Sequence, residues 1–219
     1  MNTNAKTRKM TMIAMMCAIA YLMTVLVRVP VVLFLKYDPK DVIITIGGFL
    51  FGPMVSFLIS AVVSLIEMVT ISDTGVIGCI MNFLSTCAFA CTAAYIYKKK
   101  HSLKGAVMGL LAGCVMMTAV MLLWNYLITP LYMGYPRDKV VELLLPAFLP
   151  FNLLKSGLNM AITLLIYKPV AGALRRAGLV APSKAGEEAG QGKKTGGLLV
   201  AGLILITCVL IFLALKGII

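Results

Sequence analysis

Long apolar runs, interrupted by short polar segments, set the strongest constraint on how this chain folds. Several runs approach or exceed the roughly 20 residues that an α-helix needs to cross the hydrocarbon core of a bilayer. Hydrophobic residues make up 61% of the 219 residues and charged residues 13%, whereas soluble domains are only about half apolar. The sequence therefore predicts an all-α fold of the polytopic membrane class.

Turn residues and charges divide the apolar sequence into six expected core helices. They span residues 10–29, 42–51, 53–71, 76–97, 103–129 and 150–174. The second helix is too short to cross alone, so we expect the preceding loop, residues 30–41, to dip into the membrane and wall a pocket. Pro130 is expected to end the fifth helix, and residues 142–150 to approach the sixth along the membrane interface.

The composition changes after Arg176, and this change suggests three parts. Residues 1–180 are expected to form the six-helix substrate-binding core. Residues 181–197, rich in Gly, Ala, Lys and Glu, read as a flexible cytoplasmic linker. Residues 198–219 then form an additional C-terminal transmembrane helix, whose apolar run covers 198–215. This run has no charge and no polar stripe, so we expect it to lie outside the functional core.

Basic residues are spread over the segment ends, where the positive-inside rule places them. The net charge of +12 is therefore a membrane signal, and we expect no nucleic-acid partner. With the N-terminus inside, most basic residues fall on the inner side: Lys6, Arg8, Lys9, Lys98, Lys99, Lys100, Lys104, Lys168, Arg175, Arg176, Lys184, Lys193 and Lys194. The pattern predicts a multi-pass cell-membrane protein with a cytoplasmic N-terminus.

Lys155 lies in the middle of an apolar segment, and polar residues share its helix face. A helix turns about 100° per residue, which aligns Asn152, Lys155, Ser156, Asn159 and Thr163. Ionisable residues inside a membrane normally face a cavity or a partner. One interpretation pairs Lys155 with a carboxylate on the third helix, Glu67. The interpretation that we favour has the stripe line a pocket open to the outside, and the two can coexist.

The fifth helix carries a second polar face, formed by Thr118, Asn125 and Thr129. Asn125 should lie level with Asn152 if the two helices are antiparallel neighbours. Two facing amides can recognise a planar ring with several hydrogen-bond donors and acceptors. A separate row of glycines, at 105, 109 and 113, predicts close packing against another helix.

Small residues four apart on the first helix, Ala14 and Ala18, make a flat strip. Such a strip lets another helix approach closely. It can pack internally or serve as a docking surface for a partner protein, and composition does not choose between the two.

The sequence offers little support for an enzyme. Its six cysteines lie in apolar runs without a CxxC pair, and there is one histidine, so we expect no metal site. Residues 190–195 (GQGKKT) resemble a phosphate loop but place a lysine where Ser or Thr is required. No nucleophile–base pair is recognisable, and we expect no bound cofactor.

Several motifs follow one another along the chain: FLKYDP (34–39), GGFLFGP (47–53), DTG (73–75) with MNFLS (81–85), NYLITPLY (125–132) and PFNLLK (150–155). In this order they resemble the riboflavin-specific S component of energy-coupling factor (ECF) vitamin transporters. The likeness covers residues 8–176. Two departures stand out: Lys40 occupies a position where a small polar residue is common, and the run at 198–215 has no counterpart.

The resemblance implies a six-helix bundle that binds riboflavin from outside, between the first loop and helices four to six. It implies partners as well: a transmembrane T component and two cytoplasmic ATPases, which use the ATP. The positions that match flavin-contacting residues are Asn125, Asn152 and Lys155, and the strip of Ala14 and Ala18 matches the surface that contacts the T component.

The chemistry of riboflavin extends this site. Its ring has an imide-like edge that suits amides and a lysine, and its ribityl hydroxyls need polar partners. We therefore include Asn159, Lys36, Tyr37, Asp38 and Thr129 among the expected substrate-binding residues. Two alternatives stay open: an S component for another vitamin, such as thiamine, and a membrane scaffold that binds no ligand.

Overall fold

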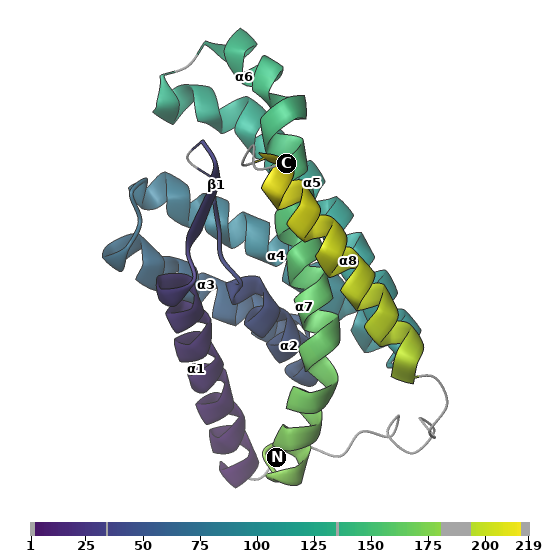
Figure 1. The fold of residues 1–219 in the computed structure, drawn as a ribbon. Coiled ribbons are helices and arrows are strands. Elements are labelled where there is room, and N and C mark those ends of the chain that lie inside the picture. Colours follow the sequence, from purple (N-terminus) through teal and green to yellow (C-terminus); the bar gives the residue numbers. More distant parts are fainter. Residues whose placement is uncertain (1–2, 34, 135, 181–193, 216–219) are drawn as a thin grey trace.

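The computed structural model describes residues 3–33, 35–134, 136–180 and 194–215, and Figure 1 shows helices almost throughout. The helices are α1 (Thr3–Leu26), α2 (Lys40–Phe51), α3 (Pro53–Thr70), α4 (Gly75–Lys99), α5 (Leu103–Met133), α6 (Arg137–Leu143), α7 (Leu149–Arg176) and α8 (Lys194–Leu215). A π-helical segment, η1 (Leu144–Phe148), joins α6 to α7. The expected linker at 181–197 falls mainly outside the described residues, and α8 begins before residue 198.

Five helical segments of the described chain are long and apolar enough to cross a membrane: Lys6–Leu26, Pro53–Thr70, Gly75–Lys99, Leu103–Leu131 and Arg137–Arg176. Helix α8 contains a shorter apolar helical stretch, Ala201–Leu210. Helix α2 has 12 residues, or about 18 Å at 1.5 Å per residue, well below the ~30 Å hydrocarbon core. The count of six core spans plus one therefore stays a prediction beyond these five.

The segment expected as a loop forms a β-hairpin instead. Strands β1 (Val29–Val32) and β2 (Leu35–Tyr37) pair antiparallel, with Val29 opposite Tyr37. Pairing gives partners to backbone groups that lipid could not hydrate. The all-α expectation thus misses this element, which directly precedes the short helix α2 in the chain. That this segment dips into the membrane stays a prediction.

The prediction that Pro130 ends the fifth helix was wrong. Helix α5 continues to Met133 and ends at Gly134, whose φ of 66° is left-handed. Pro130 lacks the N–H that would bond to the fourth residue before it, but a helix away from water gains by keeping its other backbone bonds. The interfacial approach expected at 142–150 is helical too, through α6, η1 and the start of α7.

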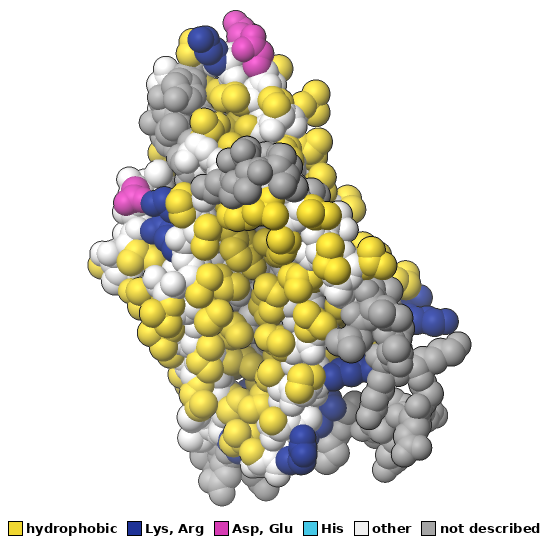
Figure 2. Space-filling view, in the orientation of Figure 1, with side chains coloured by type: hydrophobic (Ala, Val, Ile, Leu, Met, Phe, Trp, Pro, Cys, Tyr) yellow, Lys and Arg dark blue, Asp and Glu magenta, His cyan; other side chains and the backbone are white. Residues whose placement is uncertain are grey.

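Helix α4 packs against α2, α3 and α5. The predicted glycine row has a clear role at two positions. A Cβ on Gly109 or Gly113 would come within 2.7 Å of the backbone oxygen of Ala93 or Phe89, respectively, on α4. Figure 2 shows hydrophobic side chains over the middle of one face, Lys and Arg gathered mainly at its lower end, and Asp and Glu only in its upper half.

Candidate functional site

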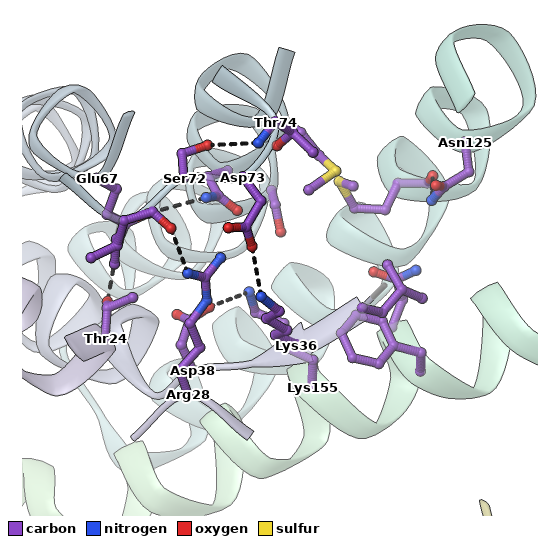
Figure 3. A pocket seen from close by; sticks show the side chains of 18 residues that line it. Thr24, Arg28, Lys36, Asp38, Glu67, Ser72, Asp73, Thr74, Asn125 and Lys155 are labelled. Carbon is purple, nitrogen blue, oxygen red and sulfur yellow. Dashed lines mark hydrogen bonds and ion pairs between the residues drawn. The ribbon is translucent and has the colours of Figure 1, made fainter. Parts of the chain in front are cut away.

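A pocket opens at the end of the bundle remote from the N-terminus, and Figure 3 shows the residues around it. Its volume is about 190 Å³. The last turn of α1, the β-hairpin, the α3–α4 turn and helices α3, α4, α5 and α7 all contribute side chains. The site thus draws on more elements than the first loop and helices four to six that we expected.

Five of the expected substrate-binding residues line this pocket: Lys36, Asp38, Asn125, Asn152 and Lys155. Each asparagine amide is oriented by its own helix. The Nδ2 of Asn125 donates to the oxygen of Met121 at 2.7 Å, and the Nδ2 of Asn152 donates to the oxygen of Phe148 at 2.8 Å.

The other three expected residues lie behind the pocket wall. The Oγ1 of Thr129 donates to the Oδ1 of Asn125 at 2.9 Å, so Thr129 supports a pocket residue. The Tyr37 hydroxyl donates to the Oδ1 of Asn159 at 3.2 Å. All three side chains are buried.

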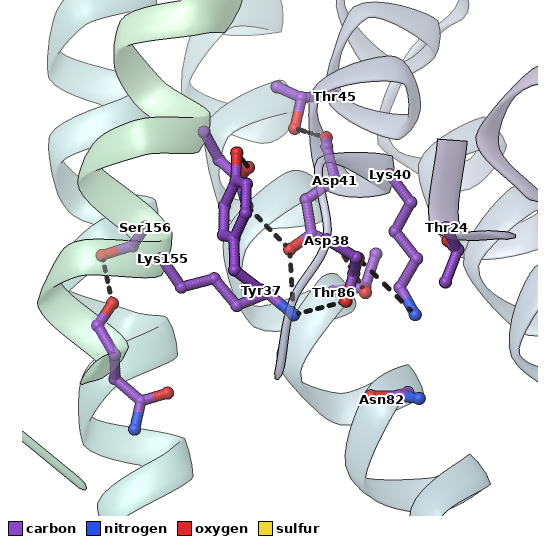
Figure 4. Close-up of polar contacts among 12 residues, drawn as sticks. Thr24, Tyr37, Asp38, Lys40, Asp41, Thr45, Asn82, Thr86, Lys155 and Ser156 are labelled. Atoms are coloured by element: carbon purple, nitrogen blue, oxygen red, sulfur yellow. Dashed lines mark hydrogen bonds and ion pairs between the residues drawn. The ribbon is translucent and has the colours of Figure 1, made fainter. Parts of the chain in front are cut away.

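Lys155 is paired with two aspartates at the start of α2 (Figure 4). Its Nζ lies 3.3 Å from the Oδ2 of Asp38 and 3.9 Å from the Oδ2 of Asp41. Asp41 also accepts hydrogen bonds from Asn159 at 3.0 Å and from Thr86 at 2.7 Å. The ammonium is buried and points inward, as the polar stripe predicted.

The pairing of Lys155 with Glu67 was wrong, because another lysine occupies Glu67. The Nζ of Lys40 contacts both carboxylate oxygens of Glu67, at 2.7 and 2.6 Å. Glu67 further accepts hydrogen bonds from Thr24 at 3.1 Å and Asn82 at 3.0 Å. Lys40 is only 1% exposed, and a buried charge requires such a partner.

The buried cluster holds one more carboxylate than lysines: Asp38, Asp41 and Glu67 face Lys40 and Lys155. The Oδ1 of Asp38 is buried and has no hydrogen-bond partner among the described residues. The Nζ of Lys40 lies 3.9 Å from this oxygen. A ligand N–H or O–H in the pocket could supply the missing donor, since an unsatisfied buried acceptor costs about 1–3 kcal/mol.

Two contacts hold the pocket rim to the α3–α4 turn. Lys36 on β2 bonds Asp73 at 2.7 Å, and Arg28 donates to the oxygen of Ile71 at 2.7 Å. The hydrogen bond from Lys36 lowers the pKa of the exposed Asp73 carboxyl. Because a lowered carboxyl pKa keeps Asp73 charged, this link persists at neutral pH and is lost only as the pH falls through that pKa.

Sequence reasoning missed several pocket residues: Thr24, Arg28, Asp73, Asn82 and Ser85. Polar residues in apolar helices were the available signal. Ser56, Ser60, Ser64 and Glu67 recur at helical spacing and are all buried on α3. This polar face indicates that α3, as well as α5 and α7, contributes residues to the site.

Ala14 and Ala18 lie on the exposed face of α1. Large apolar neighbours on that face are exposed as well, among them Met15 at 48% and Leu22 at 52%. The small-residue strip is thus not used for packing among the described residues. Its role as a docking surface stays a prediction.

Comparison with known proteins gives consistent results. The family model "ECF transporter, substrate-specific component" matches residues 8–167, which include all residues that line the pocket. The relatives include proteins named riboflavin transporters. RibU of Staphylococcus aureus (strain TCH60) is 28% identical over 179 residues, covering 77% of this chain and 93% of that protein. FmnP of Bacillus subtilis (strain 168) is 28% identical over 174 residues, covering 74% and 91%.

A solved structure also resembles this fold. It is described as the S component of a bacterial ECF transporter, and it superposes with a TM-score of 0.66 at 28% identity. The match covers 78% of this chain and 99% of that one. With a family model that spans the greater part of the chain, this protein belongs to the family of substrate-specific components of ECF transporters.

Proposed function

We propose that this protein captures riboflavin from outside the cell and mediates its uptake together with an ECF T component and two ATPases. The observation that carries the proposal is the pocket in which Asn125, Asn152 and Lys155 meet, within the region shared with the named riboflavin transporters. An S component supplies recognition, and its partners supply the energy.

The groups around the pocket match the chemistry of a flavin. Asn152 and Lys155 offer donors and acceptors for the imide-like edge of the ring, and the Oδ1 of Asp38 needs a donor. Met121 and Phe151 give the pocket an apolar wall that suits the dimethylbenzene end. A ligand that lacks the polar edge would leave buried groups unpaired, and this provides selectivity.

The pocket must widen to receive such a ligand. Its volume of about 190 Å³ is below the roughly 300–1,000 Å³ of typical small-molecule sites. The hairpin is the element best placed to move, because its rim contact is the exposed pair of Lys36 and Asp73. Exposed ion pairs contribute only about 0–1 kcal/mol, so opening this contact costs little.

Membrane orientation follows from the same proposal. The N-terminus faces the cytoplasm of a bacterial cell, and the pocket, at the opposite end of α1, faces outside. Residues 1–180 form the substrate-binding core, the chain between 181 and the start of α8 is a cytoplasmic link, and α8 is a further membrane helix. The exposed strip at Ala14 and Ala18 is offered to the T component.

Asn152→Ala tests the ligand site directly. We expect riboflavin to bind the purified protein with quenching of its fluorescence, and the variant to bind about tenfold more weakly, or ~1.4 kcal/mol. The reason is that Asn152 lines the pocket and is only 2% exposed, so its loss leaves polar ligand atoms unpaired. Fluorescence titration in detergent measures both affinities.

Thr70→Ala is the matched control, because Thr70 is exposed on α3 and bonds only to its own helix, at the oxygen of Ile66. This control should bind riboflavin as the unaltered chain does. Equal affinity of the Asn152 variant would refute the site. Native mass spectrometry of the purified chain with another vitamin bound, such as thiamine, would refute riboflavin as the ligand.

A further inference from the structure

Helix α8 lies beyond the region that the family model matches and packs along α7 (Figure 1). The contact is close at one point. A Cβ on Gly157 of α7 would come within 2.8 Å of the Sγ of Cys208 on α8, so the absence of a side chain at 157 admits Cys208. Ala201 and Cys208 are buried, at 1% and 5% exposure. These contacts describe a specific helix pair.

The same helix reaches the β-hairpin that borders the pocket. Val31 of β1 and Tyr37 of β2 share a buried apolar cluster with Cys208, and Phe212 packs against this cluster. Successive side chains of a strand point to opposite faces. Lys36, beside Tyr37, lines the pocket, while Tyr37 itself faces the apolar side. The hairpin is therefore held between the pocket and α8.

We propose that α8 braces the β-hairpin against α7 and so slows the release of a bound ligand. A two-stranded hairpin is marginally stable by itself and needs packing on one face. Helix α8 supplies part of that packing in the closed state. The part of this proposal that concerns ligand release rests on the proposed function, whereas the bracing of the hairpin does not.

The packing between the β-hairpin and α8 is also incomplete, so the hairpin can move relative to α8. A partly open apolar pocket of about 190 Å³ lies among Val31, Tyr37, Leu158 and Phe212. Contacts within the protein are therefore incomplete here, which reduces the dispersion energy that holds these side chains together. The hairpin can therefore shift on its brace without breaking a polar contact to α8, and α8 sets how often it does so.

The test is Gly157→Ala, which places a methyl group within 2.8 Å of the Cys208 Sγ, so that either this side chain or α8 itself must shift. We expect amide hydrogen exchange in β1 and β2 of the ligand-free protein to become at least about threefold faster, because the hairpin opens more often. We expect riboflavin dissociation, followed by recovery of fluorescence after dilution, to accelerate about fivefold, since changes at a binding site act mainly on the dissociation rate.

Two further variants separate the brace from a general loss of stability. Adding Cys208→Ala to Gly157→Ala removes the clashing sulfur and should restore both rates, as a double-mutant cycle requires. Gly172→Ala is the matched control on α7, because nothing lies within 4 Å of a Cβ at that position. It should leave both rates unchanged.

Phe212→Ala gives an independent reading, since it removes a contact without inserting a wedge. It should also speed hairpin exchange. Unchanged hairpin exchange in both Gly157→Ala and Phe212→Ala would overturn the brace. Because exchange is measured without ligand, a chain that binds no riboflavin would defeat the proposed function and leave this result to decide the brace separately.

Discussion

Replacing Lys155 with Met will weaken riboflavin binding by about a hundredfold, or ~2.7 kcal/mol. The ammonium is buried in the pocket wall and lies 3.3 Å from Asp38. Removing one partner of a buried pair costs about 3–5 kcal/mol, and Asp38 would then keep only the Lys40 ammonium, 3.9 Å away. The variant therefore loses a ligand contact and disturbs the acceptor that faces the ligand. Fluorescence titration of the purified variant measures the loss.

A second substitution separates binding from stability. Adding Asp38→Asn to Lys155→Met removes both charges, so the thermal unfolding midpoint should recover most of what the single variant loses. Riboflavin affinity should stay low in the double variant, because both pocket groups are gone. Recovery of affinity together with stability would show that Lys155 acts only through folding.

Lys36→Met shows what the loss of an exposed lysine charge at the pocket does to riboflavin binding, for comparison with the buried Lys155. Lys36 also lines the pocket, but its ion pair with Asp73 is exposed. We expect it to weaken binding by less than tenfold, because exposed pairs are screened and contribute about 0–1 kcal/mol. A loss as large as that of Lys155→Met would contradict the importance that we assign to burial.

The polar stripe on α7 could be predicted from spacing, but its partners could not. A helical wheel fixes which side chains share a face, and the structure places Asn152 and Lys155 together in the pocket. The partner of Lys155 is separated from it by 117 residues. Glu67 is a candidate partner from sequence because it lies in a spanning helix. The wheel of α7, however, carries no information about the start of α2 and the turn before it, which bring Asp41 and Asp38 to Lys155.

Helix boundaries set by nearby residues could also be predicted, whereas those set by the surroundings of the backbone could not. Charges and glycines placed the start of α3 at Pro53 and the short α2 correctly, since these signals act within a few residues. The extension of α5 past Pro130 and the β-hairpin at 29–37 depend on what surrounds the backbone. In lipid or protein surroundings, an unpaired backbone N–H or C=O costs more free energy than in water. This cost then outweighs the helix propensity of single residues.

The second large effect is expected from Lys40, which departs from the residue usual in its motif. Lys40→Met should destabilise the protein by about 3 kcal/mol, because it leaves the carboxylate of Glu67 buried without its cation. For a chain of this size that corresponds to a fall of roughly 6–12 °C in Tm. Thermal unfolding in detergent, followed by circular dichroism, measures the change.

A double variant tests whether stability depends on the Lys40–Glu67 ion pair itself or only on avoiding an unpaired buried charge. Lys40→Met with Glu67→Gln removes both charges and keeps side chains of similar volume, and such replacements are often neutral or stabilising. The Gln offers one oxygen and one NH2 group where Glu67 now accepts from Thr24 and Asn82 at two different oxygens. Its oxygen can accept from Asn82, and its NH2 group can donate to the hydroxyl oxygen of Thr24. We therefore expect Tm to return close to that of the unaltered chain. If Lys40→Met alone left Tm unchanged, water would have to reach Glu67, and the closed wall between α2, α3 and α4 would be refuted.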